Sequence, residues 1–120
     1  MSRINMIDFA CKRFDLKEII KCSLGLTRAE ISLFYFFLEN HNSYFNTEEL
    51  STKLKLDLST IQKGVKKLNG RNIIIQQQQN LDGGGYLYYY KFNSKEEVKK
   101  VLKGIIKNWS KNVECAINKI

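Results

Sequence analysis

The chain has 120 residues, of which 43% are hydrophobic and 27% are charged, so it predicts one globular domain with a single core. Twenty basic residues against twelve acidic ones give a net charge of +8, which favours a polyanionic partner, either nucleic acid or an acidic membrane surface. A single histidine and three cysteines without a C-x-x-C pair exclude histidine-rich metal sites, zinc ribbons and thioredoxin-type motifs. We therefore expect neither a metal nor a cofactor.

The same sequence gives expectations about location and redox state. No stretch approaches the roughly 18 apolar residues that span a bilayer, and charges interrupt MSRINMIDFACKRFD too early for a signal peptide. We expect a cytoplasmic protein that does not enter a membrane. Buried, structural cysteine is the favoured reading of Cys11, Cys22 and Cys115, and redox sensing is the alternative, because lysines adjoin the first two.

The N-terminal third predicts helices. Residues 4–12 resemble a short amphipathic helix, and the Asp15/Glu18 spacing predicts a helix that runs to about Cys22 and is broken by Gly25. A capping box of Thr27 and Glu30 then begins the strongly apolar run ISLFYFFLEN. A helix this apolar must be largely buried, so we expect it at the centre of the core.

Two further helices follow a loop at residues 41–45. Asn46 and Glu49 predict a helix that ends near Leu54, and Asp57 is the expected N-cap of the next one. The inward face of this second helix is predicted from four apolar residues at spacings of three and four, beside which Gly64 would permit close packing. We expect Gly70 to end the helix in the left-handed conformation. The four inward residues are Leu58, Ile61, Val65 and Leu68.

The last part predicts a hairpin and one long helix. Two β-rich runs, residues 73–79 and 86–92, flank the turn NLDGGG. Ser94 and Glu97 then cap a helix that continues to the end, with apolar residues at heptad spacing. One small domain cannot bury this seam along its whole length, so we predict a homodimer. The predicted interface consists of Leu102, Ile106, Trp109, Val113, Ala116 and Ile120.

These elements together predict a mainly α fold with a small β-hairpin, an α+β winged helix-turn-helix. We divide the single domain 1–120 into N-terminal helices (1–25), a winged helix-turn-helix core (26–92) and a C-terminal dimerisation helix (94–120). Residues 26–92 resemble small archaeal winged-helix transcriptional regulators of the TrmB-like and MarR/ArsR-type groups. The stretches that carry the resemblance are LTRAEISLFYFFLEN, EELSTKLKLDLSTIQKGVKKL and NLDGGGYLYYYK. The resemblance implies dimers formed through the terminal helices.

The helix over residues 58–69 is the predicted recognition helix. Residues 53–71 carry six basic side chains and one acidic side chain, so much of the basic excess gathers there. Polar residues near the start of this helix suit base edges in the major groove, and the later lysines suit phosphates. The predicted contacts to double-stranded DNA are Ser59, Thr60, Gln62, Lys63, Lys66, Lys67 and Arg71.

Other functions stay open at this point. The tip of the hairpin, residues 81–85, has no lysine or arginine, so its contact with DNA is undecided and a protein-interaction module is an alternative. A non-specific architectural DNA-binding protein is another. No nucleophile, base and orienting group assemble from the sequence, and GGG lies between two strands where a phosphate loop needs a following helix, so we expect no enzyme. Nothing in the sequence names a small-molecule effector.

Overall fold

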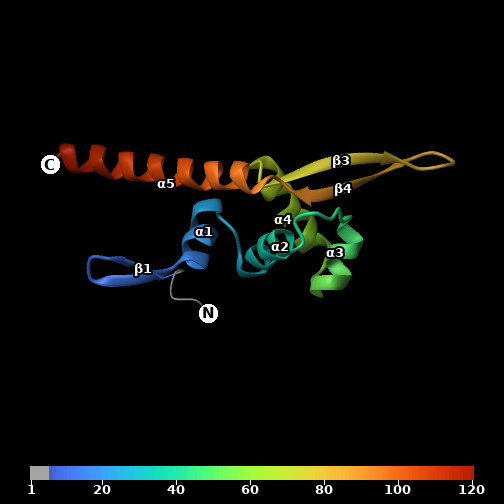
Figure 1. Cartoon of the computed structure of the whole chain (residues 1–120), viewed down its shortest axis with the longest axis horizontal. Coiled ribbons are helices and arrows are strands. Elements are labelled where there is room, and N and C mark those ends of the chain that lie inside the picture. Colours follow the sequence, from blue (N-terminus) through green and yellow to red (C-terminus); the bar gives the residue numbers. More distant parts are fainter. Residues whose placement is uncertain (1–5) are drawn as a thin grey trace.

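The computed structural model describes residues 6–120 and has an elongated shape of 63 × 32 × 26 Å. Its radius of gyration is 17.0 Å, whereas a compact chain of this length would have about 14 Å. Figure 1 shows the reason, because the long C-terminal helix and the β3–β4 hairpin extend in opposite directions from a small helical core. The elements are β1 (Met6–Phe9), β2 (Lys12–Asp15), α1 (Leu16–Leu24), α2 (Arg28–Glu39), α3 (Thr47–Leu54), α4 (Leu58–Gly70), β3 (Ile74–Asn80), β4 (Tyr86–Phe92) and α5 (Lys95–Asn118).

The core forms around α2, as the apolar run predicts. Phe34 and Phe37 of this helix are almost completely buried, and Phe92 from the end of β4 packs edge to face on Phe34 with the ring centroids 6.0 Å apart. Leu50 of α3 and Leu68 of α4 complete the interior of the three-helix unit. The expected mixed α+β architecture with a winged-helix-like arrangement is confirmed.

Side-chain caps define where the core helices begin. Thr27 and Asn46 each accept a hydrogen bond from the backbone of the third helical residue, and Glu30 and Glu49 accept one from the cap backbone in return. Both predicted capping boxes are therefore confirmed. Asp57 occupies the N-cap of α4 as expected, but its side chain makes no capping hydrogen bond.

The expectation for the end of α4 was wrong. Gly70 is the last residue of the helix, and the left-handed conformation falls two residues later on Asn72, with φ of 64°. Asparagine tolerates this conformation better than most residues. The turn is held by the Ile73 amide, which donates to the Leu68 carbonyl, and by Asn93, whose side-chain amide donates to the Asn72 carbonyl.

The β3–β4 hairpin forms the wing. Its antiparallel register pairs Ile74 with Phe92 and Asn80 with Tyr86. The predicted loop before α3 also contributes, because Phe45 exchanges two backbone hydrogen bonds of 2.8 Å with Tyr90 and so adds a short third segment. The base of the wing is thereby attached to the core, and its tip extends beyond it.

The predicted helix over residues 4–12 was wrong in its described part, and residues 4 and 5 lie outside the described residues. An antiparallel hairpin of β1 and β2 stands there instead, with Ala10 in a left-handed turn. The physical reason is a period of two: Ile7 and Phe9 lie on one face and Asp8 on the other. Of the N-terminal helices that were expected, the described residues contain α1, which begins at the predicted cap Asp15 and ends at Gly25.

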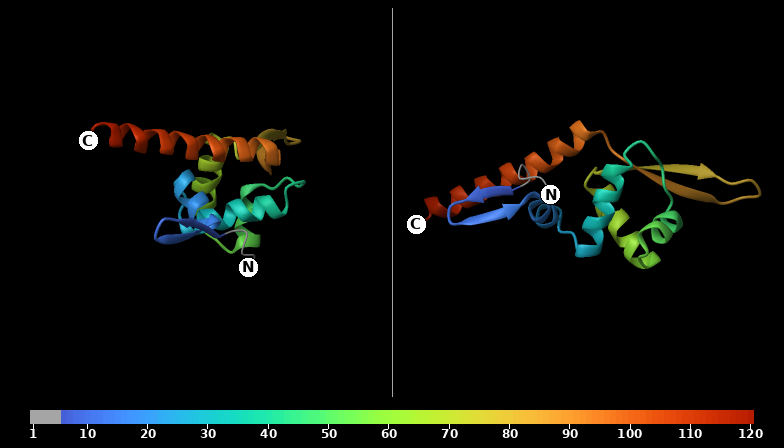
Figure 2. Two further views of the ribbon diagram at one scale, coloured as in Figure 1. Left: turned by 60° about the vertical axis from the view of Figure 1, so that its left-hand side comes forward. Right: turned by 60° about the horizontal axis from the view of Figure 1, so that its bottom comes forward.

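The long helix α5 leaves the core after its first turns. Val98 is buried, Val101, Leu102 and Ile105 are half-buried against the core, and every residue from Ile106 onward is exposed. Figure 2 shows α5 as a projecting rod, with α1 against one side of it and the β1–β2 hairpin running in the same direction. No helix among residues 6–120 is long and apolar enough to cross a membrane.

Candidate nucleic-acid interface

The predicted recognition helix α4 has one buried face and one open face. Ile61, Val65 and Leu68 are buried, as predicted. Most of the residues that were predicted to contact DNA lie together on the opposite side, exposed to solvent, and only Thr60 is half-buried. The exposed members are Ser59, Gln62, Lys63, Lys66 and Lys67, with Arg71 exposed just beyond the helix.

Leu58 does not belong to the buried face, contrary to the expectation. Its side chain is 41% exposed at the first position of α4, because the helix begins at the edge of the core and the inward stripe starts one turn later. An exposed leucine beside Ser59 and Gln62 adds an apolar contact to this end of the helix. Major-groove surfaces offer thymine methyl groups to such side chains.

Gly64 allows α4 to lie directly against α2, as the sequence indicated. A Cβ atom at this position would stand 2.8 Å from Cδ2 of Leu33 and 3.3 Å from Cγ of Glu30. Leu33 is itself almost completely buried, so it has little room to move. The glycine therefore sets the depth of α4 in the fold and with it the position of the exposed face.

Lys67 holds the same two helices together through an ion pair. Its Nζ donates to Oε1 of Glu30 at 2.7 Å and to the carbonyl of Gly25 at 3.1 Å. Burial raises the pKa of Glu30, but the hydrogen bonds from Lys67 and from the Thr27 backbone outweigh it and keep the pKa below its ordinary value. Lys67 thus has a structural partner that the sequence pattern did not reveal.

Lys63 and Lys66 have no carboxylate partner among the described residues. Two more exposed lysines, Lys53 and Lys55, lie at the end of α3 and in the turn before α4. Both lysines belong to the basic stretch 53–71, but they are not among the predicted contacts. Helical spacing gives no signal for a side chain that lies in a turn. Exposed lysines therefore lie both on α4 and in the segment that leads into it.

The wing differs chemically from α4. From Asn72 to Tyr90 it carries no lysine or arginine, and its tip is a run of three glycines with positive φ. Tyr86 and Tyr88 are exposed and pack edge to face with ring centroids 5.2 Å apart. A hydrogen bond with Tyr86 raises the pKa of Tyr88, so the outer part of the wing presents neutral phenols and amides beside one carboxylate, that of Asp82 at the tip.

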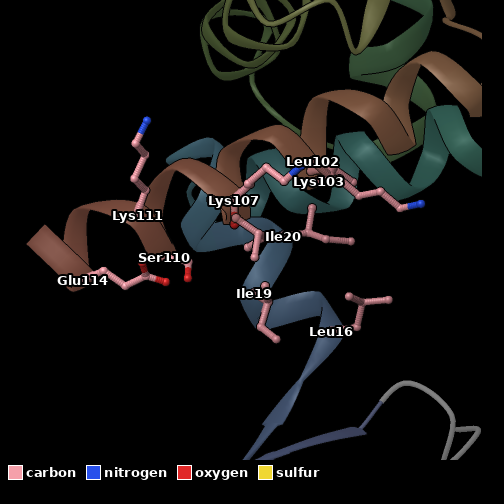
Figure 3. A pocket seen from close by; sticks show the side chains of 11 residues that line it. Leu16, Ile19, Ile20, Leu102, Lys103, Lys107, Ser110, Lys111 and Glu114 are labelled. Atoms are coloured by element: carbon pink, nitrogen blue, oxygen red, sulfur yellow. The ribbon is translucent and has the colours of Figure 1, made fainter.

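The predicted dimer seam runs along α5 from the half-buried part of the helix into the part that is exposed to solvent. Leu102 is half-buried on the domain, whereas Trp109 is 57% exposed and the later members of the seam are open to solvent. Between α1 and α5 lies a groove of about 600 Å³ with Ile19 and Ile20 on one wall. Figure 3 shows these isoleucines of α1 beside α5, with Lys111 directed away from them.

The favoured expectation for the cysteines was wrong. Cys11, Cys22 and Cys115 are all exposed free thiols, because Cys11 lies in the β1–β2 turn and the other two lie on outward faces of α1 and α5. No group of three or more metal-ligating side chains occurs within residues 6–120.

Known proteins are similar to this chain over most of its length. A solved structure of a possible transcriptional regulator from Methanosarcina mazei Go1 is 42% identical, covers 95% of both chains and has a TM-score of 0.89. The crystal structure of the ST1889 protein from Sulfolobus tokodaii covers 81% of this chain and 93% of that one with a TM-score of 0.64, and at 21% identity it shows the fold alone. An uncharacterized protein of Methanocaldococcus jannaschii is 25% identical over 114 residues, 95% of this chain and 84% of that protein.

The family differs from the groups that the sequence resembles. The likeness to a possible archaeal regulator is supported by the Methanosarcina structure, but the family model that matches is neither TrmB-like nor of the MarR/ArsR type. The match extends over residues 14–113, from the second strand of the first hairpin into the free half of α5. The chain therefore belongs to the DnaD N-terminal domain family.

Proposed function

We propose that the chain is a sequence-specific, double-stranded DNA-binding transcriptional regulator that acts as a homodimer, with α4 in the major groove. The observation that carries the proposal is the open face of α4, where the side chains of Ser59, Gln62, Lys63 and Lys66 are exposed. The opposite face of the helix packs closely on α2 at Gly64. The likeness to a possible transcriptional regulator supports it. We propose no catalytic step, and the expectation that the chain is not an enzyme stays a prediction.

The residues of α4 divide into two roles under this proposal. Gln62 has the donor and acceptor to pair with adenine, and Lys63 reaches guanine acceptors from the same end of the helix. Lys66, one turn later, neutralises a phosphate and gives no base preference. Two such helices in a dimer read half-sites about 34–36 Å apart.

Fluorescence anisotropy tests the proposal with a duplex from upstream of the chain's own gene beside a scrambled duplex, at several salt concentrations. We expect a preference of about a thousandfold or more for the specific duplex. Gln62→Ala should relax the base preference, whereas Lys66→Ala should weaken binding to both duplexes and lower the salt slope by about one. Equal effects of the two changes on both duplexes would refute the assignment of roles.

Lys107→Ala on α5 is the matched control for Lys66→Ala. Both remove one exposed lysine, but Lys107 lies on the projecting helix, so specific binding should change little. A larger loss with Lys107→Ala would favour non-specific architectural binding along α5. The related change Lys67→Ala must be accompanied by a stability measurement, because it also removes the partner of the buried Glu30.

The absence of lysine and arginine from Asn72 to Tyr90 of the wing supports a second candidate function, a protein-interaction module. Leu81, Tyr86 and Tyr88 form an exposed, largely neutral surface at its tip, and protein partners favour such aromatic surfaces. This candidate predicts weak DNA binding that is equal for both duplexes and steeply dependent on salt.

A further inference from the structure

The groove between α1 and α5 combines an aliphatic floor with a basic edge. Its volume of about 600 Å³ falls within the range of about 300–1,000 Å³ that is typical of small-molecule pockets. Such pockets are mostly apolar and contain a few polar groups that orient the ligand. The groove has no part in the proposed function, so it is a separate candidate site. Its aliphatic lining consists of Leu16, Ile19, Ile20, Leu102 and Ile106.

The aliphatic floor favours an alkyl group. Ile19 is half-buried and Ile106 is 42% exposed, so apolar surface remains in contact with water in the groove. Covering such surface with an alkyl chain is favourable because it removes apolar area from water. The α5 wall extends from Leu102 to Glu114, which is about 18 Å along the helix axis. A narrow, extended aliphatic chain suits a groove of this length.

The edge on α5 favours a negative charge. Lys103 and Lys107 lie one helical turn apart, both are exposed, and neither forms an ion pair within residues 6–120. Figure 3 shows both side chains on the α5 side of the groove, whereas Lys111 is directed away. Glu114 lines the far end of the same wall and disfavours an anion there. The favourable place for one negative charge is therefore beside Lys103 and Lys107.

We propose that the groove binds a small amphipathic anion, an aliphatic monocarboxylate. The alkyl chain lies on Ile19, Ile20 and Ile106, and the carboxylate accepts hydrogen bonds from Lys103 and Lys107. Hydrogen bonds between two charged groups are stronger than neutral ones, so the carboxylate fixes the direction in which the chain lies. The argument for this occupant is the charge complementarity between a carboxylate and the two lysines.

The same charges disfavour a second copy of this chain as the occupant. A second copy has a net charge of +8, and its own basic α5 laid in the groove would bring like charges against Lys103 and Lys107. An uncharged apolar segment would cover the floor but leave the two lysines without a partner. The α1 wall and these lysines lie outside the predicted dimer seam, which shares Leu102 and Ile106 with the groove.

Isothermal titration calorimetry of the full chain without DNA tests the site, with decanoate below its micelle concentration as the probe. We expect saturable binding at least about tenfold tighter than that of uncharged 1-decanol, because the alcohol lacks the hydrogen bonds between charged groups. Acetate has the charge without the alkyl chain and should bind at least about a hundredfold more weakly than decanoate. A failure of DNA binding would not alter these titrations, so the two proposals are tested separately.

A pair of double variants tests the role of the lysines. Lys103→Met/Lys107→Met removes both charges but keeps long unbranched side chains, so it should weaken decanoate binding about tenfold and leave 1-decanol binding unchanged. Lys99→Met/Lys100→Met is the matched control, because it removes two exposed lysines of α5 that do not line the groove. Circular dichroism checks that both variants keep their helices. Equal effects of the two double variants on decanoate binding would overturn the proposal.

Methyl NMR of isoleucine-labelled chain shows where the probe binds. The methyl signals of Ile19 and Ile106 should shift with decanoate and saturate at the affinity measured by calorimetry, whereas Ile75 on the wing should not respond. Shifts at Ile7 of the first hairpin without shifts at Ile19 would place the ligand elsewhere and overturn the proposal. An Ile19 signal that responds to chain concentration and not to decanoate would assign the groove to a second copy, which also overturns it.

Discussion

At the scale of single residues, the contact between α2 and α4 determines where the open face of α4 stands. Gly64 permits the close approach, and the pair of Glu30 and Lys67 joins the same helices at their edge. Glu30 is only 4% exposed, so its charge depends on Lys67 and on the Thr27 backbone for compensation. These residues determine the position of the exposed face of α4 and the stability of the fold, and under the proposed function they would affect DNA binding only in this indirect way.

Gly64→Ala should destabilise the fold by about 1 kcal/mol. Helix propensity favours alanine by about 1 kcal/mol, but overpacking against the buried Leu33 costs about 1–3 kcal/mol. Gly104→Ala is the control, because a Cβ there meets nothing within 4 Å and should stabilise α5 by up to about 1 kcal/mol. Urea unfolding of both variants measures the difference, and equal stabilisation by both would contradict the close approach.

Glu30→Gln should lower the free energy of unfolding by about 1–3 kcal/mol at neutral pH, because a buried charged hydrogen bond to Lys67 is lost. The pKa of Glu30 is depressed in the folded state, so its stabilisation is present above the pKa of the unfolded chain and is lost as pH falls through the folded pKa. The difference between wild type and variant should therefore shrink on acidification from pH 7 to pH 3. Glu39→Gln, at an exposed position on the same helix, is the control, and a loss of stability at pH 7 as large as that of Glu30→Gln would contradict the role of the pair with Lys67.

At the scale of elements, capping residues in the local sequence determine where most of the helices begin. Thr27, Asn46 and Ser94 were identified as caps from the sequence, and each accepts the expected backbone hydrogen bond. These signals are readable because a cap and its partner lie three residues apart and need no other part of the fold. The first hairpin was missed since apolar residues in MIDFACKRF fit both a period of two and a loose helical spacing.

Asn46→Ala should cost about 1 kcal/mol of stability, because it removes the oxygen that accepts from the Glu49 amide at 2.8 Å. Asp57→Ala should cost less, since the Asp57 side chain makes no capping hydrogen bond and acts on α4 only through its charge. Thermal unfolding of the two variants compares them directly. A larger cost at Asp57 would show that α4 depends on this carboxylate for its start.

At the scale of the whole molecule, the elongated shape is consistent with the proposed homodimer. The radius of gyration of 17.0 Å belongs to a core with two long projections, and an isolated helix end with Trp109 and Val113 exposed has little to keep it folded in water. In the proposed homodimer, pairing of two α5 helices would remove this apolar stripe from water. Trp109 is the single tryptophan, so tryptophan emission reports on the surroundings of this residue alone.

We expect a mass of twice 14.0 kDa by light scattering at high concentration, with a blue shift of the Trp109 emission over the same concentration range. Val113→Ser should move both transitions to higher concentration by tenfold or more, because it removes an apolar group from the middle of the seam. Lys111→Ser serves as the control, because Lys111 lies on the side of α5 opposite the seam. A mass of 14.0 kDa at every concentration would refute the dimer.

The sequence by itself determined the helices of the core, their caps, the wing and the concentration of basic charge around α4, because periodicity, capping and turn chemistry are local properties. Only the tertiary structure decided which of those side chains are available. It engaged Lys67 with Glu30, exposed Leu58 and the three cysteines, and left the first hairpin and half of α5 uncovered. Pairing and burial depend on residues far apart in the chain, such as Glu30 and Lys67 across two helices, and no local pattern records which of them meet.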